Sequence, residues 1–183
     1  MAQPLHVSLS NGLPRYDLDT IRHLIEIVAT LCDAPLEHTA IHVKQGGVVG
    51  RQISGMAYYN RDGKPFSQQA HRSRINTHPD ACELVTLRMG KDYAYRYANG
   101  TYQVMHYARY TTFPHTKVYT WHEEFVYLLA HELCHIAQYH RPRRTNGRAS
   151  ASEYECEQAA IRCLHLYRYI TTQHTGTAHA ARS

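Results

Sequence analysis

The chain has 183 residues, 43% of them hydrophobic, which suits one globular domain with a buried core and excludes a wholly disordered chain. No apolar run reaches the roughly 18 residues of a membrane-spanning helix, and the N-terminus lacks the basic and apolar regions of a signal peptide. We therefore expect a cytoplasmic protein without a membrane contact. The net charge of +5 is mildly basic and comes mostly from scattered residues.

Two features of the composition bear on partners and redox state. A group of arginines after the middle of the chain could contact nucleic acid, although a solvated loop is the simpler explanation. The group consists of Arg141, Arg143, Arg144 and Arg148. The cysteines are odd in number and form no C-x-x-C pair, which predicts free thiols in a protein that is not secreted.

In chain order, the first predicted element is a helix that starts after Asp17 or Asp19 and runs to about Cys32. Either aspartate can cap it, and apolar side chains recur along one stripe of the helix. Residues 39–44 alternate in polarity and are β-branched, so they predict a strand. Residues 51–59 suggest a second strand after a glycine-rich turn.

The middle of the chain predicts a loop, a strand and then a hairpin. Residues 60–80 are polar and contain several turn-forming residues, so a loop is expected there. Residues 83–89 have the composition of a strand. Residues 93–97 and 101–110 flank an Asn-Gly dipeptide at 99–100, which is the strongest short-range signal for a β-hairpin.

A helix of about six turns is predicted for residues 120–140. Thr120 and Glu123 have the T-x-x-E spacing of a capping box. Mostly strong helix formers follow, with no glycine or proline inside the segment. Pro142 then ends the helix, because proline cannot continue a helix interior.

This helix carries the sequence H-E-x-x-H at His131, Glu132 and His135. Residues four apart lie on one face of a helix, so both imidazoles can point at one metal ion. Glu132 then lies beside the metal, where it can take a proton from an activated water. Two ordinary histidines with a chance glutamate are the alternative, but the uncharged neighbours and the separate capping signal favour a metal site.

The last predicted helix begins near Ser150 or Ser152 and runs to about Ile170, since either serine can act as its cap. The small polar residues that follow predict a flexible tail. The chain shows no internal repeat and no second domain boundary. It therefore divides into an N-terminal segment at 1–16, one domain at 17–170 and a C-terminal tail at 171–183.

A catalytic zinc usually has three protein ligands and one open position, so a third ligand is needed. His140 is the obvious candidate, but it points about 180° away from His131 on the same helix. Glu153 and Glu157 are four residues apart and share a face of the last helix. One of them can bind the metal while the other orients a ligand histidine. Carboxylates that merely favour the helix dipole are the alternative, which suits Glu153 better than Glu157.

The pattern H-E-L-C-H, followed about twenty residues later by E-Y-E-C-E, resembles the gluzincin metallopeptidases. In the most similar branch a second helix carries E-x-x-A-D, and the match covers roughly residues 120–165. Here Glu157 stands in place of the aspartate and Cys156 in place of the alanine. The resemblance implies a zinc ion bound by His131, His135 and Glu153, with Glu132 as general base and Glu157 as the support of a ligand histidine.

A weaker similarity is to SprT-like proteases, which are small basic zincins associated with DNA. That family uses a third histidine downstream of H-E-x-x-H, and no histidine here is convincingly placed for that role.

The predicted elements and the gluzincin resemblance together imply an α+β, zincin-like single domain. A small mixed β-sheet with a β-hairpin would pack on the active-site helix and on further helices. In zincins the strand at the edge of the cleft pairs with an extended substrate, and residues 101–110 are expected to supply that edge.

The implied activity is hydrolysis of peptide bonds in a peptide or protein substrate. One catalytic zinc would activate water, and Glu132 would act as general base. The alternatives are a DNA-associated protease and a non-catalytic protein that binds zinc or a partner.

Overall fold

The computed structural model describes residues 6–9, 17–34, 36–45, 55–59, 81–89, 102–103, 116–140 and 149–180. Within these residues the chain forms three helices, which are α1 (Leu18–Cys32), α3 (Trp121–His140) and α4 (Ala149–Ala180). The strands of the same residues are β1 (His6–Leu9), β2 (Thr39–Gln45), β3 (Gly55–Tyr59), β4 (Glu83–Met89), β5 (Tyr102–Gln103) and β6 (Lys117–Val118). The fold class is mixed α+β.

Four strands form a mixed sheet in the order β1-β2-β4-β3. Strands β1, β2 and β4 are parallel, whereas β3 runs antiparallel to β4. Ile41 of β2 and Ala57 of β3 both lie beside Val85 of β4, which fixes the register on either side of that strand. Strands β5 and β6 form a separate antiparallel pair.

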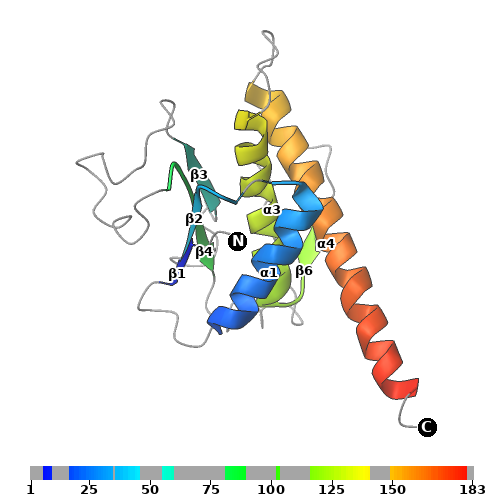
Figure 1. The fold of residues 1–183 in the computed structure, drawn as a ribbon. Helices are drawn as coiled ribbons and strands as arrows, with labels where there is room; N and C mark the ends of the chain where they lie inside the picture. The colour runs from blue at the N-terminus through cyan, green and yellow to red at the C-terminus, as the bar shows by residue number, and fades with distance from the viewer. Residues whose placement is uncertain are drawn as a thin grey trace.

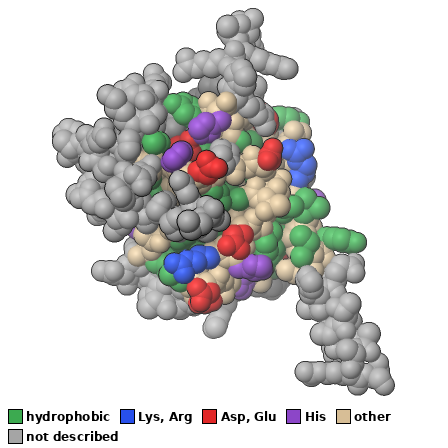
Figure 2. Space-filling view, in the orientation of Figure 1, with side chains coloured by type: hydrophobic (Ala, Val, Ile, Leu, Met, Phe, Trp, Pro, Cys, Tyr) green, Lys and Arg blue, Asp and Glu red, His purple; other side chains and the backbone are tan. Residues whose placement is uncertain are grey.

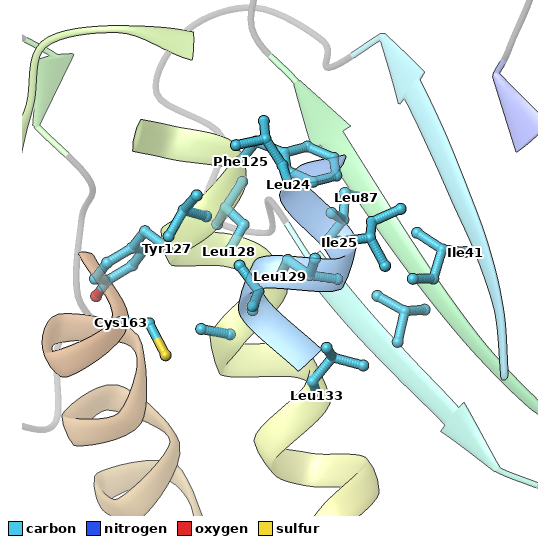
Figure 3. Close-up of a cluster of buried hydrophobic side chains, with 14 of the residues drawn as sticks. Leu24, Ile25, Ile41, Leu87, Phe125, Tyr127, Leu128, Leu129, Leu133 and Cys163 are labelled. Carbon is cyan, nitrogen blue, oxygen red and sulfur yellow. The ribbon is translucent and has the colours of Figure 1, made fainter. Parts of the chain in front are cut away.

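The helices lie on one side of this sheet, with α3 in the middle of the molecule (Figure 1). Helix α3 contacts β3 and β4 on one side and α1 and α4 on others. The core between α1, α3 and the sheet is apolar and closed to solvent (Figure 3). Its fully buried side chains include Ile25 of α1, Ile41 and Leu87 of the sheet, and Phe125, Leu129 and Leu133 of α3. This packing holds the H-E-x-x-H helix rigidly against the sheet.

The starts of α1 and α3 follow the predicted capping signals. The Asp17 carboxylate accepts hydrogen bonds from the backbone amides of Asp19 and Thr20, at 3.4 and 2.9 Å, so Asp17 is the cap of α1. At α3 the Thr120 hydroxyl accepts from the amide of Glu123 at 3.2 Å. The Glu123 carboxylate accepts in turn from the amide of Tyr119, whereas a capping box would have it accept from the amide of Thr120.

The end of α1 is also explained by its backbone. Asp33 takes a left-handed conformation with φ of 50°, and its amide donates back to the carbonyls of Ala29 and Thr30. Asp and Asn tolerate this region better than most residues, which is why the helix can stop here without a glycine.

Several predicted features differ in the structure. Helix α4 begins at Ala149 and ends at Ala180, so it starts slightly earlier than expected and runs well past Ile170. The hydroxyls of Thr171 and Thr172 donate to carbonyls one turn back, so these polar groups have hydrogen-bond partners within the helix. None of the helices described is long and apolar enough to cross a membrane.

The predicted hairpin strands are largely outside the described residues, as is the Asn-Gly turn at 99–100. Of the expected edge strand at 101–110, the structure describes β5, and β5 pairs with β6 rather than joining the four-stranded sheet. Among the described strands, the end of the sheet next to α3 is formed by β3. The expectation that residues 101–110 supply this edge is therefore wrong for the part that is described.

Candidate metal centre

Helix α3 presents two imidazoles toward the same point in space. His131 and His135 are one turn apart, and their Nε2 atoms are 3.2 Å from each other. Each side chain is 18% exposed, so both rings are mostly covered but accessible on one side. The helical spacing predicted from the sequence therefore brings the two nitrogens together.

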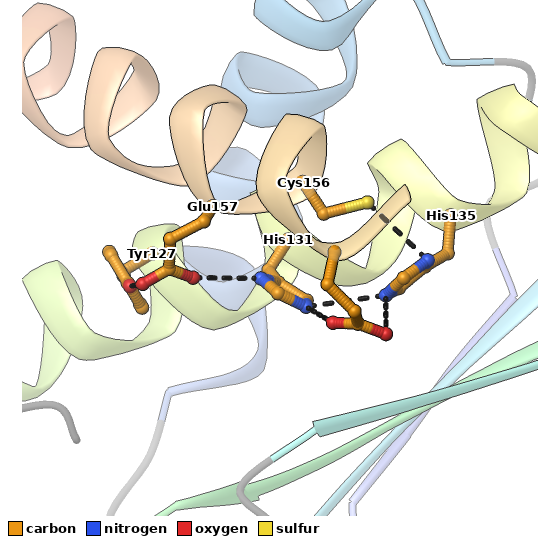
Figure 4. Close-up of polar contacts among 6 residues, drawn as sticks. Tyr127, His131, His135, Cys156 and Glu157 are labelled. Carbon is orange, nitrogen blue, oxygen red and sulfur yellow. Dashed lines mark hydrogen bonds and ion pairs between the residues drawn. The ribbon is translucent and has the colours of Figure 1, made fainter. Parts of the chain in front are cut away.

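Helix α4 supplies the third group of this cluster. One carboxylate oxygen of Glu153 lies 3.3 Å from His131 Nε2, and the other lies 3.5 Å from His135 Nε2. The candidate ligand atoms of the three residues all lie within 4.8 Å of one another. Within the described residues this is the one cluster of histidine, cysteine and acidic groups that could hold a metal ion. Figure 4 shows the imidazoles of His131 and His135 next to Cys156 and Glu157 of α4.

The far nitrogen of each imidazole also has a partner from α4. His131 Nδ1 lies 3.2 Å from Glu157 Oε2, and His135 Nδ1 lies 3.4 Å from the sulfur of Cys156. An ionised carboxylate can only accept a hydrogen bond, so with a metal at Nε2 His131 would carry its proton on Nδ1 and donate it to Glu157. The same tautomer of His135 would let Cys156 accept through its sulfur while the Cys156 thiol hydrogen-bonds to Cys134.

This arrangement fits a divalent metal. Two imidazole lone pairs and a carboxylate converge at distances where they repel each other unless a proton or a cation lies between them. Nitrogen and oxygen donors of this kind form the three-ligand set of many catalytic zinc sites. The Nδ1 contacts resemble the outer hydrogen bonds that orient metal-bound histidines in such sites. The residues present therefore fit a zinc ion.

The charges of the cluster shift the protonation of its members. Hydrogen bonds from His131 and His135 hold the pKa of the Glu153 carboxyl well below its ordinary value. Burial alone would lower the pKa of His135, but its hydrogen bond to Glu153 and the nearby Glu132 carboxylate raise that pKa overall. The ionised carboxylate of Glu153 thus faces two imidazole nitrogens, which is the electrostatic setting of a site for a proton or a cation.

Glu132 lies against strand β3, about 100° around α3 from His131 and about 60° from His135. Its side chain is buried, and the backbone amide of Ala57 donates a hydrogen bond to its carboxylate. A Cβ atom at Gly55 would lie 2.3 Å from Glu132 Oε1 and 2.8 Å from its Cγ. Only glycine leaves room for the carboxylate at that point of the strand. Burial raises the pKa of Glu132 above its ordinary value, against the lowering effect of His131 and His135.

His140 is not part of the cluster. Its Nε2 is hydrogen-bonded to the buried carboxylate of Glu83, at the start of β4. The other oxygen of Glu83 accepts from the Thr39 hydroxyl at 2.6 Å. His140 thus ties the end of α3 to the sheet, on the opposite face of the helix from His131.

Sequence reasoning missed three contributors to the site. Gly55 and Ala57 lie next to Glu132 only because β3 packs on α3, and no local sequence pattern predicts that packing. Tyr127 hydrogen-bonds to Glu157 and could have been found, since it precedes His131 by one helical turn and shares its face. The cysteines are free thiols as expected, and the arginine group at 141–148 lies outside the described residues.

In the space-filling view, histidine and acidic side chains lie next to one another on the face of the molecule that is drawn (Figure 2).

Comparison with known proteins finds no matching family model, no matching curated protein and no matching solved structure. The case for a function therefore depends on the geometry of the site itself.

We predict that Gly55→Ala destabilises the protein by about 1–3 kcal/mol, because the new methyl group must displace a buried carboxylate or part of β3. Urea unfolding of the metal-free protein measures this cost. The control is the same change in a Glu132→Ala background, where the obstructing carboxylate is gone and the cost should largely disappear. An equal cost in both backgrounds would show that Gly55 is needed for some other reason.

The ligand assignment predicts an order of zinc affinities among three variants. Glu153→Ala should lose zinc most severely, because Glu153 touches both histidines. Glu157→Ala should lose about 10- to 100-fold, as expected for a group that only orients a ligand. His140→Ala should bind zinc almost normally, since its ring faces Glu83. Titrations against one competing chelator measure the order, and a weakest binder other than Glu153→Ala would disprove the assignment.

Proposed function

We propose that the chain is a zinc-dependent metallopeptidase of the gluzincin type with a zincin-like fold. The observation that carries the proposal is the convergence of His131, His135 and Glu153 beside a buried Glu132. These three side chains would hold the metal. When bound there, zinc would lower the pKa of water and polarise the scissile carbonyl.

Glu132 is suited to the role of general base. Its carboxylate is held by the Ala57 amide and bordered by Gly55, so its position does not depend on solvent. From α3 it follows His131 directly in sequence, which keeps it near the metal ligands. We propose that it takes the proton of the attacking water and delivers it to the departing amine.

Strand β3 supports a peptide as the substrate. It is the last strand of the sheet order among the described residues, and it runs antiparallel to β4. The Ala57 amide is directed at Glu132 and therefore points away from β4. The backbone groups on that side of β3 could pair with an extended peptide and bring its scissile bond toward Glu132.

The composition of the cluster favours catalysis over a structural zinc. Structural zinc sites are normally closed by four protein ligands, often cysteines. Within the described residues this cluster has three ligands, and the Glu153 side chain is 33% exposed. A site of this kind leaves one position for water or substrate.

The first test is metal content. The purified protein should contain about one equivalent of zinc, and zinc at about a thousandfold over its dissociation constant should add roughly 4 kcal/mol of stability. For a chain of this length that corresponds to a rise in Tm of roughly 8–16 °C over the chelated protein. Metal analysis and thermal melts measure both effects. A protein without zinc, whose melt does not respond to added zinc, would end the metal proposal.

The second test separates chemistry from binding. Glu132→Gln keeps the size of the side chain but removes the base, so it should retain zinc and lose nearly all hydrolysis of labelled casein. Glu155→Gln is the matched control, because Glu155 contacts Gln138 of α3 rather than the metal cluster. The control should keep wild-type turnover. Turnover by Glu132→Gln near that of wild type would exclude Glu132 as general base.

A further inference from the structure

Tyr127 is a buried tyrosine whose hydroxyl belongs to the surroundings of the metal cluster. Its side chain is 2% exposed, and its hydroxyl donates a hydrogen bond to Glu157 Oε1. The other oxygen of the same carboxylate lies 3.2 Å from His131 Nδ1. Figure 4 shows the three side chains in a row, from Tyr127 through Glu157 to the imidazole of His131.

We propose that Tyr127 is a positioning residue of the metal centre, whose hydroxyl holds Glu157 so that Glu157 fixes the imidazole of His131 toward the metal. This inference rests on the proposed zinc site. It concerns how that site is kept in shape, not which residues bind the ion.

The hydroxyl can act this way because both carboxylate oxygens of Glu157 are used. A carboxylate held by one partner can rotate about its last bond, and the hydrogen bond to the imidazole then weakens. With Tyr127 on one oxygen and His131 on the other, the plane of the carboxylate is set. Burial raises the pKa of Tyr127, so its hydroxyl keeps the proton that it donates.

The two helices share this row between them. Tyr127 and His131 lie one turn apart on α3, and Glu157 enters from α4. A shift of α4 along α3 would move Glu157 relative to both partners at once. The row therefore couples the docking of α4 to the direction of a ligand imidazole.

The second imidazole is held differently. His135 Nδ1 contacts the sulfur of Cys156, which is a weaker hydrogen-bond acceptor than a carboxylate. The support provided by Tyr127 and Glu157 thus falls on His131 alone. An effect of Tyr127 on the metal should accordingly pass through Glu157 and not through a general loosening of the site.

A simpler role for the hydroxyl is to satisfy a buried carboxylate for stability. The two roles make different predictions. A stabilising hydroxyl changes the unfolding of the metal-free protein and leaves the intrinsic zinc affinity unchanged. A positioning hydroxyl changes the zinc affinity and the ligand field of the bound ion.

The experiment compares Tyr127→Phe with wild type in zinc titrations against a competing chelator and in the visible spectrum of bound Co²⁺. We expect about tenfold weaker zinc binding, at the low end of the loss seen for groups that orient ligands, and a changed Co²⁺ spectrum. Tyr167→Phe is the matched control. It removes a hydroxyl from a half-buried tyrosine that lies about 15 Å along α4 from Glu157, and it should bind both ions as wild type does.

The decisive comparison adds Tyr127→Phe to Glu157→Ala. If Tyr127 acts through Glu157, the double variant should bind zinc no more weakly than Glu157→Ala alone. Wild-type affinity and spectrum in Tyr127→Phe would overturn the inference, as would a full additional loss in the double variant. Failure of the zinc site itself would be visible in the wild-type titration, so the two failures are distinguishable. Should Glu157→Ala fail to fold, the Tyr127→Phe and Tyr167→Phe pair still decides the question.

Discussion

The contact between α3 and α4 is the interaction on which the site depends. Almost every turn of α3 offers one polar side chain to α4, beginning with Glu123, which binds Arg168 through two bonds of 2.9 Å. Tyr127 and His131 then meet Glu157, His135 meets Cys156, and Gln138 donates to Glu155 at 3.0 Å. The partners on α4 fall in residue number as those on α3 rise, so the helices are antiparallel. Several specific contacts fix their register, and with it the place of Glu153.

These polar contacts between α3 and α4 are stable because the rest of α3 is apolar and buried. Phe125, Leu129 and Leu133 point into the core beneath the sheet, where they exclude water and hold the helix in place. Burial then strengthens the interactions on the other side, since charges near a low-dielectric interior are less screened. The crowding of two imidazoles and a carboxylate is tolerable in such a place only if a proton or a cation is shared among them. The core thus maintains a site that attracts positive charge.

How far the sequence predicts this structure depends on how local each signal is. Asp17 and Thr120 cap their helices by accepting hydrogen bonds from amides only three residues ahead, so the sequence alone predicts their roles. The spacing of His131 and His135 has the same local character. Whether Glu153 or Glu157 meets them depends on how α4 docks, and helical spacing alone leaves both possible.

Strand pairing is harder to foresee than helical spacing. Nothing near Gly55 in the sequence points to Glu132, since β3 meets α3 only after the sheet has assembled. The same holds for β5, which pairs with β6 and not with a strand of the four-stranded sheet. For α4 the polar composition after Ile170 predicts an end, but the helix continues to Ala180, and the hydroxyls of Thr171 and Thr172 bond to carbonyls within it.

The two halves of the proposed chemistry are supported by different neighbours of one helix. Glu132 is held by β3, through the Ala57 amide and the space at Gly55, whereas His131 and His135 are held by partners on α4. Because all three residues belong to α3, the distance from base to ligands is set by the backbone of a single buried helix. A disturbance of α4 should therefore change metal binding first, and a disturbance of β3 should change the position of the base first.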